Sequence, residues 1–148
     1  MSVPPEDILC RFIDPKDWSD DDQRPALSAF KSSRDKHTRT NKLSLWHQDR
    51  IVNNGSQIRD LCIDLLAGFG EALITTRDIL DSAKDLRSPV FKPQVLWRPD
   101  EVVQPWVDWK DAHVNVESEQ PSSGFPDDFR LLLAERCYVS RPPDRNEG

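Results

Sequence analysis

Short apolar runs and stretches of alternating apolar and polar residues recur along the chain, and they predict β-strands. They lie at residues 8–13, 26–30, 43–47, 72–74, 94–97 and 111–117. Aspartate, proline and glycine punctuate the connections between them, which predicts loops and turns. Trp18, in the aspartate-rich connection after the first strand, is expected to turn back onto the core.

Three further segments are predicted to be helices. Apolar residues recur at helical spacing over residues 58–66, and Gly68 fits the left-handed residue that ends such a helix. Thr75 is the predicted cap of a second helix, because Asp78 completes a capping box three residues on. A third helix is expected over residues 127–138. Its inward side chains are Phe129, Leu132 and Leu133.

Strands and helices follow one another unevenly, so the pattern predicts an α+β fold. We expect a mixed or mostly antiparallel sheet of four to six short strands, with three helices packed on it. A parallel doubly wound sheet would need regular strand–helix alternation. We expect residues 1–7 to be a flexible lead, residues 8–138 a single domain and residues 139–148, rich in Arg, Pro and Asp, a disordered tail.

Composition and charge narrow the classes of function. The 148 residues are enough for one hydrophobic core, and the net charge of −6 argues against a general nucleic-acid-binding surface. No apolar run reaches the length that spans a bilayer, so we expect no membrane partner. The three cysteines, Cys10, Cys62 and Cys137, are odd in number and widely spaced. They indicate reduced thiols in a cytoplasmic protein.

Three of the five tryptophans fall between residues 97 and 109, interleaved with acidic residues. One interpretation is a binding surface for a partner protein, anchored by the aromatic rings. The alternative is that the rings fill the edge of the core. The candidate partner-binding residues are Trp97, Arg98, Asp100, Trp106, Asp108, Trp109 and His113.

His113 is also a candidate for chemistry. In the predicted strand at residues 111–117 it shares the polar face with Asn115 and Glu117. A histidine among acidic residues tends to gain proton affinity. Two interpretations stay open, a general base and an ordinary surface histidine.

Residues 31–42 carry five basic side chains against one acidic side chain, in an otherwise acidic protein. This contrast in charge favours contact with phosphate or nucleic acid through this loop alone. The alternative is a solvated hairpin extension, and the loop has no aromatic residue on which bases could stack. The candidate polyanion-binding residues are Lys31, Arg34, Lys36, Arg39 and Lys42.

The sequence lacks the common short motifs of catalysis and metal binding. It contains no H-E-x-x-H, C-x-x-C, G-x-S-x-G, G-x-G-x-x-G or P-loop pattern. The acidic stretch at residues 14–22 lacks the glycine and glutamate spacing of an EF-hand calcium loop. We therefore expect neither a metal nor a cofactor.

Residues 8–11, 24–31 and 43–45 resemble the start of a group of small uncharacterised bacterial proteins with the pattern L-x-R, R-P-S-S-x-A-F and L-S-V. A later Ala-His pair in that group matches Ala112 and His113, whereas Ala26 and Leu27 replace its paired serines. The resemblance implies a shared fold, a bacterial cytosolic origin and a role beside larger partners, including in defence and toxin systems. It implies no established activity.

The first strands are also similar in outline to ADP-ribosyltransferase-type domains, which use an early Arg or His, a Ser or Tyr on a second strand and a late Glu. The resemblance would give these roles to Arg11, to Ser28 or Ser44, and to Glu117.

Two functional hypotheses result. The leading one is a non-enzymatic bacterial protein-interaction module, an adaptor or regulator that uses the aromatic–acidic surface. The rival is a small enzyme or nucleotide-processing domain. It requires Arg11 and His113 to converge on one bound ligand, together with Ser28 or Ser44.

Overall fold

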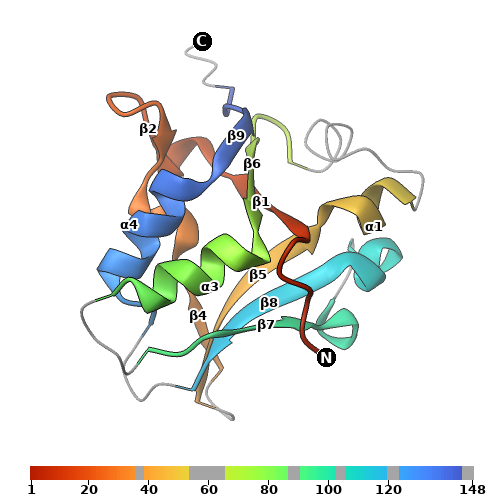
Figure 1. Ribbon diagram of the computed structural model, residues 1–148. Helices are drawn as coiled ribbons and strands as arrows, with labels where there is room; N and C mark the ends of the chain where they lie inside the picture. The colour runs from red at the N-terminus through yellow and green to blue at the C-terminus, as the bar shows by residue number, and fades with distance from the viewer. Residues whose placement is uncertain (36–38, 54–65, 87–90, 103–105, 120–123, 145–148) are drawn as a thin grey trace.

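The computed structural model describes residues 1–35, 39–53, 66–86, 91–102, 106–119 and 124–144 (Figure 1). These residues form an α+β fold built on a large antiparallel sheet, so the predicted fold class is confirmed. The described strands outnumber the four to six that were expected. The helix predicted over residues 58–66 falls almost entirely outside the described residues. Gly68 has the expected left-handed backbone, with φ of 83°.

The main sheet of the described chain has seven strands, in the order β7-β8-β5-β1-β6-β9, with β4 paired to β5. All of these pairs are antiparallel. The strands are β1 (Ile8–Ile13), β4 (Ser33–Asp35), β5 (Thr40–His47), β6 (Gly70–Thr75), β7 (Gln94–Trp97), β8 (His113–Ser118) and β9 (Tyr138–Arg141). A small second sheet joins β2 (Trp18–Ser19) to β3 (Arg24–Pro25).

Three α-helices and four short 3-10 helices connect the described strands. The α-helices are α1 (Gln48–Asn53), α3 (Thr76–Lys84) and α4 (Asp127–Arg136). The 3-10 helices are η1 (Pro15–Asp17), η2 (Leu27–Phe30), η3 (Pro99–Glu101) and η4 (Val107–Ala112). α3 begins as predicted, since Thr75 Oγ1 accepts a hydrogen bond of 3.1 Å from the Asp78 backbone N–H.

Helices α3 and α4 cover one face of the sheet and bury the main core (Figure 1). Alternate residues of the central strands point into it. Its side chains that are at most 1% exposed include Leu9, Leu45, Val114, Ile79 and Phe129. Burial of a side chain of this size contributes about 1.5–3 kcal/mol to folding, so this face carries most of the hydrophobic stabilisation.

The opposite face of the sheet is covered by α1 and η4. Ile51 of α1 and Ala112 of η4 pack there against Cys10 and Trp46, and these four residues form a smaller apolar cluster. Cys10 alternates with the core residue Leu9 along β1, which places the two clusters on opposite faces. Ser44, Trp46 and His113 of the candidate site described below lie on this second face, whereas Arg11 lies on the Leu9 face of β1.

Ala26 precedes the 3-10 helix η2 (Leu27–Phe30), so the prediction of a strand over residues 26–30 is wrong. The Ala29 N–H donates to Ala26 O at 3.0 Å, and the Lys31 N–H donates to Ser28 O at 3.3 Å. This turn buries Ala29 and Phe30 in the main core. Alternation over only five residues fits a strand or a tight turn equally well, and packing decides between them.

Both ends of the described chain are more ordered than predicted. In the expected flexible lead, the Val3 N–H donates to Val95 O at 3.0 Å, and Met1 O accepts from the Trp97 N–H at 3.1 Å. In the expected disordered tail, residues 139–141 belong to β9 and pair with β6. A polar composition predicts disorder, but the free backbone groups of a neighbouring strand supply the missing hydrogen bonds.

Gly70 allows the end of the chain to approach β6 closely. A Cβ at this position would lie 2.5 Å from Arg141 O and 2.6 Å from Pro143 N, and both are backbone atoms. We therefore expect G70A to lower the free energy of unfolding by about 1–3 kcal/mol in urea denaturation, because the backbone must shift to relieve the clash. Unchanged stability would contradict the packing of residues 141–143 against β6.

Candidate active site

The candidate site forms where β1 and β5 separate. These strands, both wholly described, pair only at Leu9 with His47 and at Cys10 with Trp46. Beyond Cys10, β1 remains paired with β6 while β5 remains paired with β8. A cavity of about 440 Å³ is lined by residues of β1, β5 and β8 at this point. Its size suits a small-molecule ligand.

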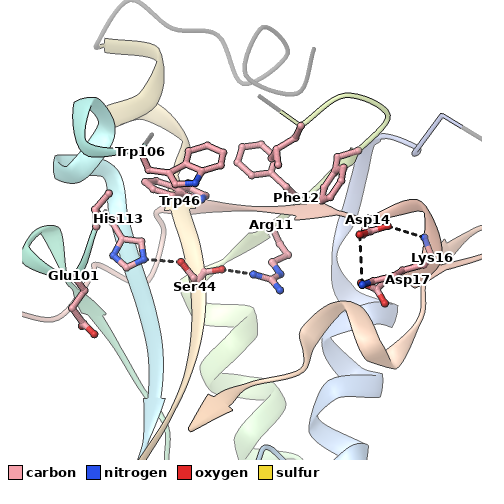
Figure 2. Close-up of a pocket in the computed structure, with 13 residues that line it drawn as sticks. Arg11, Phe12, Asp14, Lys16, Asp17, Ser44, Trp46, Glu101, Trp106 and His113 are labelled. Atoms are coloured by element: carbon pink, nitrogen blue, oxygen red, sulfur yellow. Dashed lines mark hydrogen bonds and ion pairs between the residues drawn. The ribbon is translucent and has the colours of Figure 1, made fainter. Parts of the chain in front are cut away.

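Arg11 of β1 bridges the gap between the separated strands (Figure 2). Its Nε donates to Ala29 O of η2 at 3.0 Å, and its Nη1 donates to Ser44 O of β5 at 2.9 Å. Burial lowers the pKa of the Arg11 guanidinium, and the charge of Asp17 opposes that shift. Because an arginine pKa starts far above neutrality, the side chain stays cationic.

Ser44 and His113 form a hydrogen-bonded pair in the cavity wall (Figure 2). Ser44 Oγ lies 2.6 Å from His113 Nε2, and His113 Nδ1 lies 2.7 Å from Arg98 O. A carbonyl oxygen can only accept, so Nδ1 must be the donor. In the neutral ring Nε2 then accepts the proton of the Ser44 hydroxyl. The contact to Arg98 thus selects the tautomer in which His113 can act as a base towards Ser44.

The register of β5 and β8 brings this pair together. Trp46 lies opposite His113, and Ser44 lies opposite Asn115. All four side chains share one face of the sheet, so Ser44 and His113 are diagonal neighbours. His113 is only 6% exposed, and its ring centroid lies 5.1 Å from that of Trp46.

Aromatic rings form the apolar wall of the cavity. The Trp106 ring centroid lies 5.4 Å from that of Trp46 and 6.2 Å from that of Phe12. Phe69 and Val102 extend this wall. A mostly apolar wall with a few oriented polar groups is typical of small-molecule sites.

Acidic and basic side chains complete the cavity lining at Asp14, Lys16, Asp17 and Glu101. Lys16 Nζ lies 3.9 Å from Asp14 Oδ2, and Lys42 Nζ lies 2.6 Å from Glu101 Oε1. The hydrogen bond to Glu101 raises the pKa of Lys42, although burial opposes it. Two of the three carboxylates therefore have a cationic neighbour.

Arg98 fixes the orientation of His113 from outside the cavity. Its guanidinium binds both carboxylate oxygens of Glu117, through Nε at 2.5 Å and Nη2 at 3.0 Å. Its backbone N–H donates to His113 O at 3.0 Å. Burial raises the pKa of Glu117, but the hydrogen bond and the charge of Arg98 outweigh it and leave the pKa below its ordinary value of 4.5.

The three tryptophans of the predicted partner-binding surface are half-buried packing residues. The Trp97 ring lies 5.0 Å from the His47 ring, and the guanidinium carbon of Arg50 lies 3.6 Å from the centroid of Trp97. The rings of Trp106 and Trp109, 6.1 Å apart, pack on the smaller apolar cluster. Each ring keeps part of its surface exposed.

The other predicted partner-binding residues divide between the site and its surroundings. His113 lines the cavity, and Arg98 positions it. Asp100 is exposed on η3. Nothing is described of the Asp108 side chain.

The predicted polyanion-binding residues that the structure describes lie in or beside the hairpin of β4 and β5. Lys42 lies on the sheet face and pairs with Glu101 and with Asp35, the latter at 3.6 Å. Arg34 lies in β4, whereas Lys31 and Arg39 are exposed. Lys36 is outside the described residues.

Arg11, Ser44 and His113 line the same cavity. By strand alternation, Arg11 lies on the Leu9 face of the sheet and His113 on the Trp46 face, so Arg11 contributes to the cavity from the gap between β1 and β5. Of the two serines considered, Ser28 is exposed on η2 and is not among the lining residues. Glu117 is held by Arg98 and is not among them either. Of the three groups that the ADP-ribosyltransferase resemblance would use, Arg11 and Ser44 line the cavity and Glu117 does not.

Sequence reasoning missed the residues that shape the cavity around these groups. They are Phe12, Asp14, Lys16, Asp17, Leu66, Phe69, Glu101 and Val102, with Trp46 beside Ser44. Trp46 could have been found, because it is two residues from Ser44 in a predicted strand and so shares its face. The others belong to the cavity only through long-range packing.

Within the described ranges, no group of three or more His, Cys, Asp or Glu side chains is arranged to hold a metal ion. None of the described helices has the length and apolar character needed to cross a bilayer.

Comparison with known proteins gives no further guide. No protein-family model matches this chain, and no curated protein or solved structure matches it. The chemistry of the cavity must therefore be argued from its own residues.

The pair of Arg98 and Glu117 makes stability depend on pH. Since the pKa of Glu117 is lowered on folding, its ionised form contributes stability above about pH 4.5, and this contribution is lost as the pH falls through the lowered pKa. We expect E117Q to unfold more easily at neutral pH, by about 1 kcal/mol, and to lose less stability than the wild type below pH 4.5.

The measurement is chemical denaturation across the acid range, with E119Q as the matched control. Glu119 is exposed and on the same stretch of chain. Parallel acid profiles for the wild type and E117Q would contradict the role assigned to this ion pair.

Proposed function

We propose that this protein is a small enzyme that acts on an ester or related acyl compound, with Ser44 as nucleophile and His113 as general base. The observation that carries the proposal is the contact of 2.6 Å between Ser44 Oγ and His113 Nε2 in a cavity wall, with Nδ1 bound to Arg98 O. A serine hydroxyl becomes a useful nucleophile when an oriented base accepts its proton. This geometry supplies both the base and its orientation.

The reaction follows from these atoms. Ser44 Oγ forms a bond to the carbonyl carbon of the substrate while its proton moves to His113 Nε2. The carbon–oxygen bond to the alcohol then breaks, and the alcohol leaves with the proton from Nε2. A water molecule repeats the sequence with Ser44 as the leaving group, which releases the acid and restores both side chains.

The orienting partner of His113 is a backbone carbonyl rather than the carboxylate of a Ser-His-Asp triad. A carbonyl fixes the tautomer but stabilises the imidazolium less than a carboxylate does. We therefore propose a modest rate of turnover.

The two thiols in the described part of the chain compete poorly with Ser44 as nucleophiles. Burial raises the pKa of the Cys137 thiol to about 11, so the reactive thiolate is rare at neutral pH. Cys10 is fully buried. Neither of these two thiols forms a disulfide. This state supports our proposal that the protein works in the reducing cytoplasm.

A serine-directed fluorophosphonate tests this function. We expect covalent labelling of the wild type at Ser44, no labelling there in S44A, and labelling on the order of 10²-fold slower in H113Q, because the base is lost. Intact mass and peptide mapping by mass spectrometry give the readout.

S28A is the matched control for serine labelling, since Ser28 is exposed and outside the cavity. It should label like the wild type. A wild-type protein whose Ser44 resists the reagent, or an H113Q variant that labels at the wild-type rate, would overturn the proposed function.

A protein-interaction module is our second proposal, and the partly exposed pair of Trp106 and Trp109 supports it. In this case a bacterial partner, such as the larger component of a defence or toxin system, would cover these rings. W109A should then weaken partner capture by at least about tenfold while the melting temperature falls by only a few degrees, because Trp anchors often dominate interfaces. Equal capture by W109A and the wild type would remove this proposal.

A further inference from the structure

The cavity contains a cation for which the protein supplies no close anion. Arg11 donates to two backbone carbonyls, Ala29 O and Ser44 O. In the part of the chain that the structure describes, no carboxylate oxygen forms an ion pair within 4.0 Å of its guanidinium. A guanidinium has five N–H donors, so three remain for a ligand.

Arg11 is half-buried, so part of its charge is shielded from water without a paired carboxylate. A buried charge is stabilised by a paired charge and by complete hydrogen bonding. The nearby carboxylates of Asp14 and Glu101 are already close to Lys16 and Lys42. Asp17 acts on Arg11 through its charge but makes no ion pair with it, and both residues line the cavity.

The remaining cavity wall defines the other half of the ligand. Phe12 and Trp46 both pack against Trp106, with ring centroids 6.2 and 5.4 Å from that of Trp106, and all three side chains line the cavity. Rings of this kind favour contact with a flat apolar group. Arginine in turn suits planar oxyanions, because its donors match two oxygens at once.

We propose that the cavity binds a small molecule with an oxyanion, carboxylate or phosphate, held by Arg11, and a flat apolar body held by Phe12, Trp46 and Trp106. This inference rests on the proposed function for its consequence: Arg11 also binds Ser44 O, so the oxyanion would be fixed next to the nucleophile. The substrate is then an acyl compound with a negative charge near its reacting carbon.

Binding of four related probes tests the charge of the ligand. Benzoate, phenyl phosphate, benzyl alcohol and benzylamine share an aromatic ring and differ in the group that would meet Arg11. We expect one or both anions to bind wild-type protein at least about tenfold more tightly than the alcohol in calorimetric titration. The tighter anion identifies the oxyanion class. Equal affinity for anions and alcohol, or no binding of either anion at millimolar concentration, would overturn the proposal.

Variants then test the role of Arg11. R11Q should weaken binding of the preferred anion by at least about tenfold. K31Q should change it by less than about twofold, because Lys31 is exposed and does not line the cavity. R11K keeps the charge but not the paired donors, so it should bind between the wild type and R11Q. An R11K or a well-folded R11Q variant with wild-type affinity would remove Arg11 from the site.

The probes report binding without turnover, so the two proposals can fail separately. If anion selectivity depends on Arg11 but Ser44 resists the fluorophosphonate, the proposed anion site is supported and the proposed enzymatic function is overturned. If Ser44 is labelled but the cavity shows no preference for anions, the proposed enzymatic function is supported and the proposed anionic substrate is overturned.

Discussion

The hydrogen bonds of the Arg11 guanidinium maintain the gap between β1 and β5, at the point where these two strands separate. β1 and β5 pair at two positions and then separate, and Arg11 connects them by donating to Ser44 O and to Ala29 O of η2. A continuous ladder would leave no room for a ligand between the strands. The same side chain therefore maintains the sheet and lines the cavity, and it places a positive charge beside Ser44.

A second constraint acts from the opposite side of the cavity. Arg98 is tied to β8 at three points: its N–H binds His113 O, its carbonyl accepts from His113 Nδ1, and its guanidinium binds Glu117. These contacts fix the ring of His113 and the side of it that faces Ser44. The ion pair thus serves the geometry of the site, whereas the half-buried tryptophans close the apolar wall around it.

Local patterns predicted much of the fold, but they could not predict the site as a unit. The first strand, the strand that carries Ser44 and the cap at Thr75 were predicted because neighbouring residues determine them. η2 and β9 were missed because contacts with distant residues decide their structure. Arg11, Ser44 and His113 were candidates from the sequence. Their convergence was not predictable, since Ser44 and His113 are 69 residues apart and meet only through the register of β5 and β8.

The tautomer of His113 is the most direct test of this account. Long-range proton–nitrogen NMR correlations of the ring, assigned by comparison with H113Q, show which nitrogen of the neutral imidazole carries the proton. The account predicts a proton on Nδ1, donated to Arg98 O, and an unprotonated Nε2 facing Ser44. A proton on Nε2 in the neutral ring would contradict it, because His113 would then donate to Ser44 and could not accept its proton.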